Sequence, residues 1–205
     1  MNVPNAQSPI VEKISDSIAI IRFNRPAERN ALSTTTLDNL DALLSNLNSD
    51  HDLKTIIFSG EGNVFLAGAD IRELATLDPK TARDFSRKGQ RLLQTIVEAP
   101  QVTIAAINGY CMGGGLDLAL ACDIRVASRM AVFGHPGARL GIITGWGGTQ
   151  RLPRVIGEAR ALEFFITAQN LTSKEALDIG LVSRVGDPVI DCALDFSRKK
   201  TRMAE

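Results

Sequence analysis

The strongest constraint on the fold is a nearly continuous apolar run, Val102–Ile107, which leads through the glycine-rich Asn108–Gly115 into the mostly apolar Leu116–Ala121. A strand without alternating polar residues is typical of a sheet that is covered on both faces. The apolar segment after the glycines predicts a helix that is buried on all sides. A buried strand followed by a buried helix favours an α/β fold.

The rest of the chain repeats this alternation of strands and helices. Short β-rich runs predict strands at Ile18–Phe23, Thr55–Ser59, Ile124–Ala127 and Ala131–Phe133. Apolar residues at helical spacing predict helices at Thr34–Asn48, Ala69–Leu74, Thr81–Ala99, Gln150–Ile156, Ala159–Thr167 and Lys174–Asp178, with a glycine turn at Gly145–Gly148 and a last helix from near Asp187 to the C-terminus. No internal repeat or low-complexity linker divides the sequence, so we expect one α/β domain over residues 1–205.

Composition excludes several classes of function. The 205 residues carry 23 basic and 23 acidic side chains, so no overall field draws the chain to nucleic acid or to an anionic membrane. Without a basic and apolar leader or an apolar run of about 20 residues, we expect a cytoplasmic protein with no membrane contact. The cysteines (Cys111, Cys122 and Cys192) and the histidines (His51 and His135) match no metal-binding spacing, so we expect reduced thiols and no metal site.

Two glycine-bearing turns carry the candidate chemistry. LAGADI at 66–71 and GGGLDL at 113–118 each lie between a buried segment and a helix. Helix starts leave backbone N–H groups unpaired and partly positive. If the amides of Ala69 and Gly114 converge on one carbonyl oxygen, each donor stabilises an enolate by about 3 kcal/mol. Either turn alone also fits a tight packing turn. The dinucleotide, P-loop and serine-hydrolase motifs are absent.

Five stretches together resemble one family in order and spacing. They are RPAERNAL (25–32), VFLAGADIREL (64–74), INGYCMGGGLDLALACDIRVA (107–127), FGHPGARLGI (133–142) and GWGGTQRLPRVIG (145–157). The chain resembles the enoyl-CoA hydratase/isomerase, or crotonase, superfamily from about Val11 to Val185.

The resemblance implies a spiral of repeated ββα units and an oxyanion hole made by the amides of Ala69 and Gly114. It implies substrate and coenzyme A contacts at Arg25, Ala67, Gly68, Ala69, Asp70, Ile71, Arg72, Gly113 and Gly114. Arg29 lies in the same segment as Arg25, and ordinary solvated charges remain an alternative for Arg25, Arg29 and Arg72. Coenzyme A would be part of the substrate, with no permanently bound cofactor, and we expect a homotrimer or a pair of trimers.

The sequence departs from the family pattern at the catalytic positions. Asp117 stands for the first glutamate of the hydratases, with a side chain shorter by about 1.5 Å. It could instead only complement the helix dipole. Gly137 stands for the second glutamate and has no acid or base, whereas His135 is either a substitute or a hydrogen-bonded turn residue. Trp146 either narrows the acyl pocket or packs in the core.

We therefore expect an acyl-CoA-processing enzyme of the enoyl-CoA hydratase/isomerase type, with Asp117 as the acid/base group. One such group suffices for isomerisation or for protonating an enolate, whereas efficient hydration needs a second. The alternative is a non-catalytic acyl-CoA-binding protein. The helices that usually follow the family core, and cover its acyl pocket, are expected to be absent.

Overall fold

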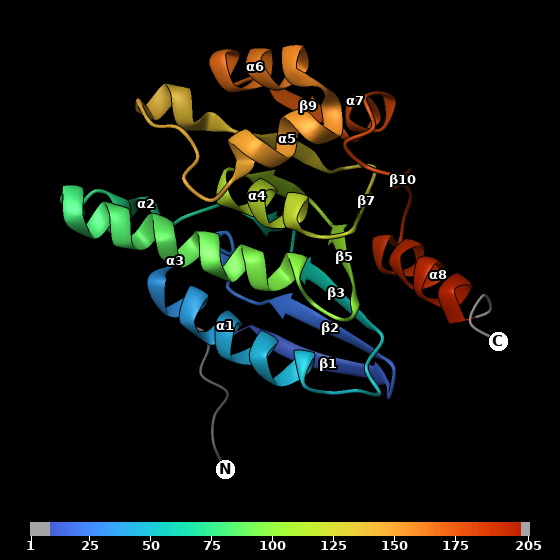
Figure 1. The fold of residues 1–205 in the computed structure, drawn as a ribbon. Helices are drawn as coiled ribbons and strands as arrows, with labels where there is room; N and C mark the ends of the chain where they lie inside the picture. Colours follow the sequence, from blue (N-terminus) through green and yellow to red (C-terminus); the bar gives the residue numbers. More distant parts are fainter. Residues whose placement is uncertain (1–8, 202–205) are drawn as a thin grey trace.

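The computed structural model describes the backbone of residues 9–201 and the side chains of residues 9–197. Its main sheet has six strands in the order β1-β2-β3-β5-β7-β10, and only the β1–β2 pair is antiparallel (Figure 1). The strands are β1 Ile10–Ser15, β2 Ile18–Phe23, β3 Thr55–Gly60, β5 Val102–Ile107, β7 Ile124–Ala127 and β10 Arg184–Val185. The predicted α/β class with parallel strands is confirmed.

A second sheet of four strands lies beside the first, in the order β4-β6-β8-β9. Its strands are β4 Val64–Leu66, β6 Tyr110–Met112, β8 Val132–Gly134 and β9 Asn170–Thr172. Each step of the spiral adds a strand to the main sheet, a strand to the second sheet and then helical structure, as in β3–β4–α2 and β5–β6–α4. This is the ββα repetition expected from the resemblance.

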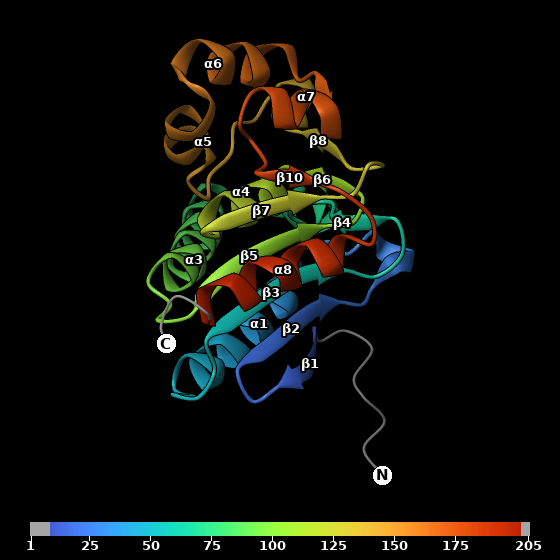
Figure 2. The same ribbon diagram turned by 90° about the vertical axis from the view of Figure 1, so that its right-hand side faces the viewer.

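The helices cover the main sheet on both faces. α1, α3 and α4 pack in sequence on one face, whereas α8 lies alone across β3, β5 and β7 on the other (Figure 2). The helices are α1 Thr34–Asn48, α2 Ile71–Leu74, α3 Pro79–Val97, α4 Gly114–Ala121, α5 Gly148–Ile156, α6 Glu158–Thr167, α7 Ser173–Asp178 and α8 Val189–Thr201, with short 3-10 turns at Pro26–Glu28 (η1) and Pro136–Leu140 (η2).

The two-sided cover explains why the strands have continuous apolar sequences. Ile20, Ile57 and Ile104 are in register across β2, β3 and β5 and face the cluster under α8. Their neighbours, such as Ile21 and Phe58, point to the larger core under α1 and α3. Successive side chains of a strand face opposite sides, so a strand buried on both sides needs apolar residues throughout.

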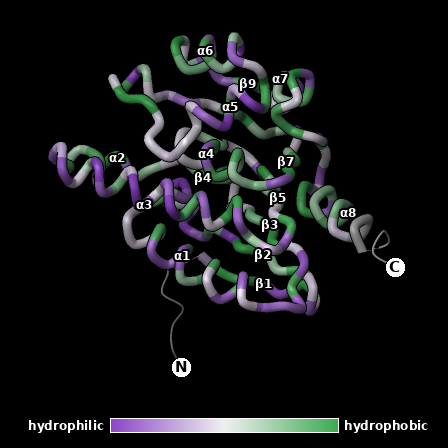
Figure 3. Tube along the Cα trace, in the orientation of Figure 1, coloured by the Kyte–Doolittle hydropathy of each residue, from purple (hydrophilic) through white to green (hydrophobic). Residues whose placement is uncertain are grey.

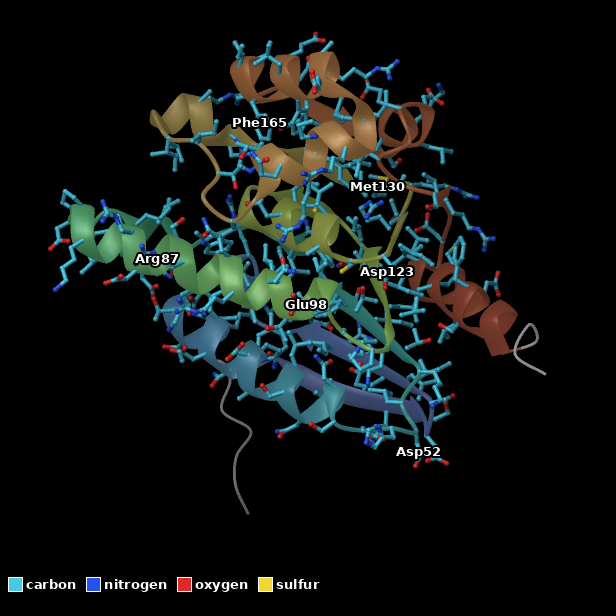
Figure 4. All side chains as sticks on the ribbon, viewed as in Figure 1. Asp52, Arg87, Glu98, Asp123, Met130 and Phe165 are labelled. Carbon is cyan, nitrogen blue, oxygen red and sulfur yellow. The ribbon has the colours of Figure 1, made fainter. Side chains whose placement is uncertain are left out.

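Polar side chains gather on the outer surface of the helices. The hydropathy-coloured trace shows hydrophobic segments in the sheet and hydrophilic segments along the exposed side of α3 (Figure 3). Arg87, in the middle of α3, and Glu98, just after its last residue, mark this exposed side (Figure 4). Within the part of the chain that the structure describes, no helix has both the length and the apolar composition to cross a bilayer.

The structure corrects several predicted element boundaries. Sequence patterns missed β1, β4, β6, β9 and β10, most of which are only two or three residues long. The helix expected from Ala69 begins at Ile71, because the side chain of Asp70 caps it by accepting from the amide of Arg72. The last helix begins at Val189 rather than near Asp187, since Pro188 precedes its first turn. The part of that predicted helix beyond residue 201 lies outside the described residues.

Candidate active site

A cavity of about 280 Å³ lies where the two glycine turns meet. The carboxyl end of β4 leads into the first turn, and β6 leads into the second, which opens α4. The predicted site residues that line the cavity are Ala67, Gly68, Ala69, Ile71, Gly113, Gly114, Asp117, His135, Gly137 and Trp146. Arg25, Asp70 and Arg72 do not line it. The structure therefore brings the two turns and the candidate catalytic side chains to one place.

The amide nitrogens of Ala69 and Gly114 border the same small space. A Cβ atom built on Gly68 would lie 3.0 Å from the nitrogen of Gly114, and one built on Gly114 would lie 3.4 Å from the nitrogen of Ala69. Gly68 and Gly113 have φ of 95° and 52°, which side chains other than that of glycine rarely allow. These two glycines let the turns approach closely.

Neither amide is used by the protein itself. Leu32 donates to the carbonyl of Gly68 and accepts from the amide of Asp70, so the intervening N–H of Ala69 faces away from Leu32. Gly114 is the first residue of α4, where a helix has no partner for its N–H groups. Within residues 9–201, neither nitrogen donates to a protein acceptor. Both donors are available to a ligand.

Asp117 is the buried carboxylate of the site. It lies three residues after Gly114 on α4 and is 1% exposed. Its Oδ2 accepts a short hydrogen bond from the hydroxyl of Thr144. Its Oδ1 lies so close to Gly148, at the start of α5, that a Cβ at this position would approach it to less than 3.0 Å. Thr144 and Gly148 fix the orientation of the carboxylate, and sequence reasoning missed this role for both.

His135 lies opposite Asp117, at the entrance of η2. Its Nε2 is 3.4 Å from Oδ1 of Asp117. Its ring meets the ring of Phe165 edge to face, with centroids 5.2 Å apart. Phe165 belongs to α6, under which it is labelled in Figure 4. Among the described residues, neither Nε2 of His135 nor Oδ1 of Asp117 has a hydrogen-bond partner.

Gly137 supplies no side chain, and the backbone leaves no room for one. Residues 136–140 form a 3-10 turn rather than an extended strand. A Cβ atom on Gly137 would lie 2.6 Å from the carbonyl oxygen of Ile142. A glutamate at position 137 would therefore require the backbone around Ile142 to move.

Trp146 is both a core residue and a wall of the cavity. Its indole is 4% exposed and lies 5.3 Å from the ring of Phe85, centroid to centroid. The five-membered part of the indole faces Gly89 of α3, and the six-membered part faces Gly114 of α4. Side chains at these two glycines would occupy the volume of the ring. Trp146 therefore packs in the core and also lines the cavity, whereas its narrowing of an acyl pocket stays a prediction.

The arginines lie at the edge of the first turn. Arg72 pairs with Asp70 at 2.6 Å and with Glu28 at 3.1 Å, although its side chain is 70% exposed. Hydrogen bonds from Arg72 hold the pKa of Asp70 below its ordinary value, and the same carboxylates raise the pKa of Arg72. Arg25 is 12% exposed and pairs with Glu28 and with two hydroxyl groups at the start of α1, 3.1 and 3.2 Å away. Arg25 thus holds η1 against α1.

No residues of the described chain form a metal centre of the usual kind. Within residues 9–201, no group of three or more histidine, cysteine, aspartate or glutamate side chains could hold a metal ion. Cys111 lies near the site, but burial and the negative charge of Asp117 raise the pKa of its thiol. A thiol held neutral in this way is a poor nucleophile.

A known family matches the chain over most of its length. The model of the enoyl-CoA hydratase/isomerase family matches residues 13–196. The chain belongs to this family.

Individual members of the enoyl-CoA hydratase/isomerase family are similar over most of the chain. A short-chain-enoyl-CoA hydratase of Clostridium acetobutylicum is 40% identical over 180 residues, which cover 87% of this chain and 69% of the relative. A crotonyl-CoA hydratase of Syntrophomonas wolfei shows the same identity and coverage. The chain spans about two thirds of the length of the curated relatives it matches.

Two solved structures that are similar to the chain in sequence share its fold. The enoyl-CoA hydratase from Bacillus anthracis superposes with a TM-score of 0.89 at 35% identity, covering 93% of this chain and 75% of that one. DspI from Pseudomonas aeruginosa superposes with a TM-score of 0.91 at 36% identity, covering 98% and 83%. The crotonase-like fold is confirmed.

Three further residues of this family member belong to the site, although sequence reasoning did not select them. Thr144 and Gly148 hold the carboxylate of Asp117, and Gly89 makes room for Trp146. The glycines on either side of Trp146 in GWGG were the available signal, because glycine next to a large side chain often marks close packing. Gly89 had no local signal, since a single glycine in a helix is not specific.

Proposed function

We propose that the chain processes acyl-CoA thioesters by enolate chemistry of the enoyl-CoA hydratase/isomerase type. The observation that carries this proposal is the pair of amides at Ala69 and Gly114, which border one space in a mostly apolar cavity and donate to no acceptor among the described residues. The names of the relatives support the class of substrate.

The two amides would act as an oxyanion hole. A thioester carbonyl that accepts from both N–H groups becomes more polarised, and negative charge that moves onto its oxygen is stabilised by about 3 kcal/mol per donor. The partial positive charge at the start of α4 adds to this effect at Gly114. Asp117, whose carboxylate lines the same cavity, would move a proton at the carbon next to the carbonyl.

The coenzyme A part of the substrate would lie along the first turn, from Ala67 to Arg72. The exposed guanidinium of Arg72 at this edge supports a contact with its phosphate groups. We place Arg25 among these contacts with an indirect role, since its hydrogen bonds hold the neighbouring segment in place. No permanently bound cofactor is needed, because the thioester itself supplies the electron sink.

Replacing single backbone amides by esters tests the oxyanion hole directly. Incorporating lactic acid at position 69, or glycolic acid at position 114, removes one N–H group and leaves the size of the residue unchanged. We expect kcat/KM for crotonyl-CoA to fall by about 10² to 10³ in each variant. The thermal midpoint should fall only slightly, since neither N–H bonds to the described protein and the ester only weakens the preceding carbonyl, of Gly68 or Gly113, as an acceptor for Leu32 or Asp117. Activity that stays within a few-fold of the wild type would contradict the proposal.

The alternative of a non-catalytic acyl-CoA-binding protein gives a different result with the unaltered protein. In deuterated water with crotonyl-CoA, an enzyme changes the absorbance of the conjugated thioester or exchanges the α-hydrogen. A pure binding protein does neither, yet a titration would show that it binds the thioester. Loss of the enzymatic signals in Asp117→Asn would support the assignment of Asp117.

Assembly as a homotrimer, or as a pair of trimers, stays a prediction from the family resemblance. Light scattering of the purified chain measures the molar mass directly. A monomeric mass across the working concentration range would contradict the predicted trimer without bearing on the oxyanion hole.

A further inference from the structure

The site contains two buried polar atoms that face each other and have no hydrogen-bond partner among the described residues: Oδ1 of Asp117 and Nε2 of His135. Their side chains are 1% and 6% exposed, they are 3.4 Å apart, and both residues line the cavity. Leaving such a group unpaired in a protein interior costs about 1–3 kcal/mol. Buried groups of this kind are usually satisfied by water or by a ligand.

The other oxygen of the carboxylate is already held in place. Oδ2 of Asp117 accepts from Thr144, and the backbone of Gly148 lies close beside Oδ1. The ring of His135 is held by its edge-to-face contact with Phe165. Because neighbouring residues hold both side chains in place, the two unpartnered atoms are fixed opposite each other.

Position 137 cannot supply a second acid/base group in this backbone. The carbonyl of Ile142 occupies the place where a Cβ atom of residue 137 would be. His135 instead lines the cavity from the residue just before the same 3-10 turn, with its Nε2 3.4 Å from Oδ1 of Asp117. His135 can thus supply the acid/base group that Gly137 lacks.

We propose that His135 is a catalytic residue and that it forms, with Asp117, a pair of acid/base groups that allows this chain to add water to a conjugated enoyl thioester. The inference rests on the proposed function, since it needs a thioester held at Ala69 and Gly114. It goes beyond that function because a single carboxylate favours isomerisation, whereas the pair provides both proton transfers of hydration.

The proton transfers balance within the pair. Oδ1 of Asp117 takes a proton from a bound water, and the water oxygen forms a bond to C3 of the enoyl thioester. The π electrons move to C2 and the carbonyl oxygen, which gives the enolate. His135, as the imidazolium, then donates its Nε2 proton to C2 and is left neutral. The proton on Asp117 returns to His135 across their 3.4 Å separation, and the net reaction is the addition of one water.

His135→Gln tests the assignment, with crotonyl-CoA as the probe. Glutamine has a similar volume and can form hydrogen bonds, but its amide group does not act as a general acid or base. We expect kcat for hydration to fall by about 10² or more, with the dissociation constant for crotonyl-CoA changed by less than about threefold. His51→Gln is the matched control, because the side chain of His51 is exposed and does not line the cavity.

A second variant covers the case in which glutamine disturbs the fold. His135→Ala leaves a space beside Phe165 into which free imidazole fits, so added imidazole should restore part of the hydration rate. Imidazole should have no such effect on the wild type or on Asp117→Asn. Binding of crotonyl-CoA, measured by titration, reports whether each variant is folded.

The outcomes separate this inference from the proposed function. A hydration rate in His135→Gln within about threefold of the wild type overturns the role of His135 and leaves the oxyanion hole standing. A wild type that binds crotonyl-CoA and exchanges its α-hydrogen, but adds no water, also overturns the inference alone. A wild type that does not bind crotonyl-CoA overturns the proposed function as well.

Discussion

Gly89→Ala should destabilise the protein, although alanine normally stabilises the interior of a helix. Gly89 lies inside α3 and is buried. In an open helix, the change from glycine to alanine would contribute about 0.5–1 kcal/mol of stability. Here a Cβ atom would lie less than 3.0 Å from three atoms of the indole of Trp146. Carbon atoms in good contact are about 3.5–4.0 Å apart, so the ring or the helix must shift by at least about 0.5 Å.

The expected magnitude follows from the packing around Trp146. The ring is 4% exposed and is confined on its other side by Gly114, so it has little space to move into. Overfilling a packed core costs about 1–3 kcal/mol. Subtracting the middle of the helix gain from the middle of this range, we expect the free energy of unfolding to fall by about 1 kcal/mol. For a chain of this length, the thermal midpoint falls by about 2–4 °C.

A double-mutant cycle separates this clash from other effects. Phenylalanine at position 146 is smaller, so Gly89→Ala should cost less in a Trp146→Phe background. The coupling energy between the two changes should reach about 1 kcal/mol, measured by urea unfolding of the four proteins. Because a displaced indole moves towards Gly114, Gly89→Ala should also weaken the binding of crotonyl-CoA. Unchanged or increased stability of Gly89→Ala would refute the packing argument.

Three further changes probe other parts of the structure. Gly148→Ala should displace the carboxylate of Asp117 by about 1 Å and lower kcat by about 10²-fold, with KM little changed. An unchanged kcat in steady-state kinetics would count against this expectation. The buried side chain of Asn30 accepts from one backbone amide and donates to two backbone carbonyls. Asn30→Ala should therefore lower the free energy of unfolding, measured in urea, by about 3 kcal/mol. A decrease below about 1 kcal/mol would contradict this role. The hydrogen bonds from Arg22 hold the pKa of Glu12 below its ordinary value. The pair therefore stabilises the folded state at pH values above the ordinary pKa of glutamate, and this stabilisation is lost as the pH falls through the lowered pKa of Glu12. The midpoint of Glu12→Gln should therefore decline less than that of the wild type between about pH 5 and pH 3, and equal declines would argue against a role for the pair.

The core elements could be predicted because each one is encoded by its own segment. The strand Val102–Ile107 and the helix Thr34–Asn48 have the predicted bounds, since their apolar patterns and flanking residues are local features. Of the second sheet, the sequence predicted only β8. β4, β6 and β9 have three residues each, which is too short for a period of two to stand out, and their pairing with distant strands defines them.

The candidate site shows the same division. The sequence identified the two glycine turns and the positions of Asp117, His135 and Trp146. It did not indicate that His135 faces Asp117, because a strand pattern predicts the direction of a side chain only if the strand continues. The 3-10 turn at Pro136 ends it. The sequence also gave no indication that the guanidinium of Arg25 pairs with Glu28 and with hydroxyl groups at the start of α1, and its contact with a ligand stays a prediction.

The sequence by itself determined the α/β class, most of the core and the family, because burial, helix periodicity and glycine turns depend on neighbouring residues. Only the tertiary structure decided which groups meet. The turn at 66–71 and the turn at 113–118 approach each other because β4 and β6 pair side by side in the second sheet. Contacts between segments so far apart depend on how the spiral closes, and no local pattern of residues encodes the distance between two amides or between a carboxylate and an imidazole.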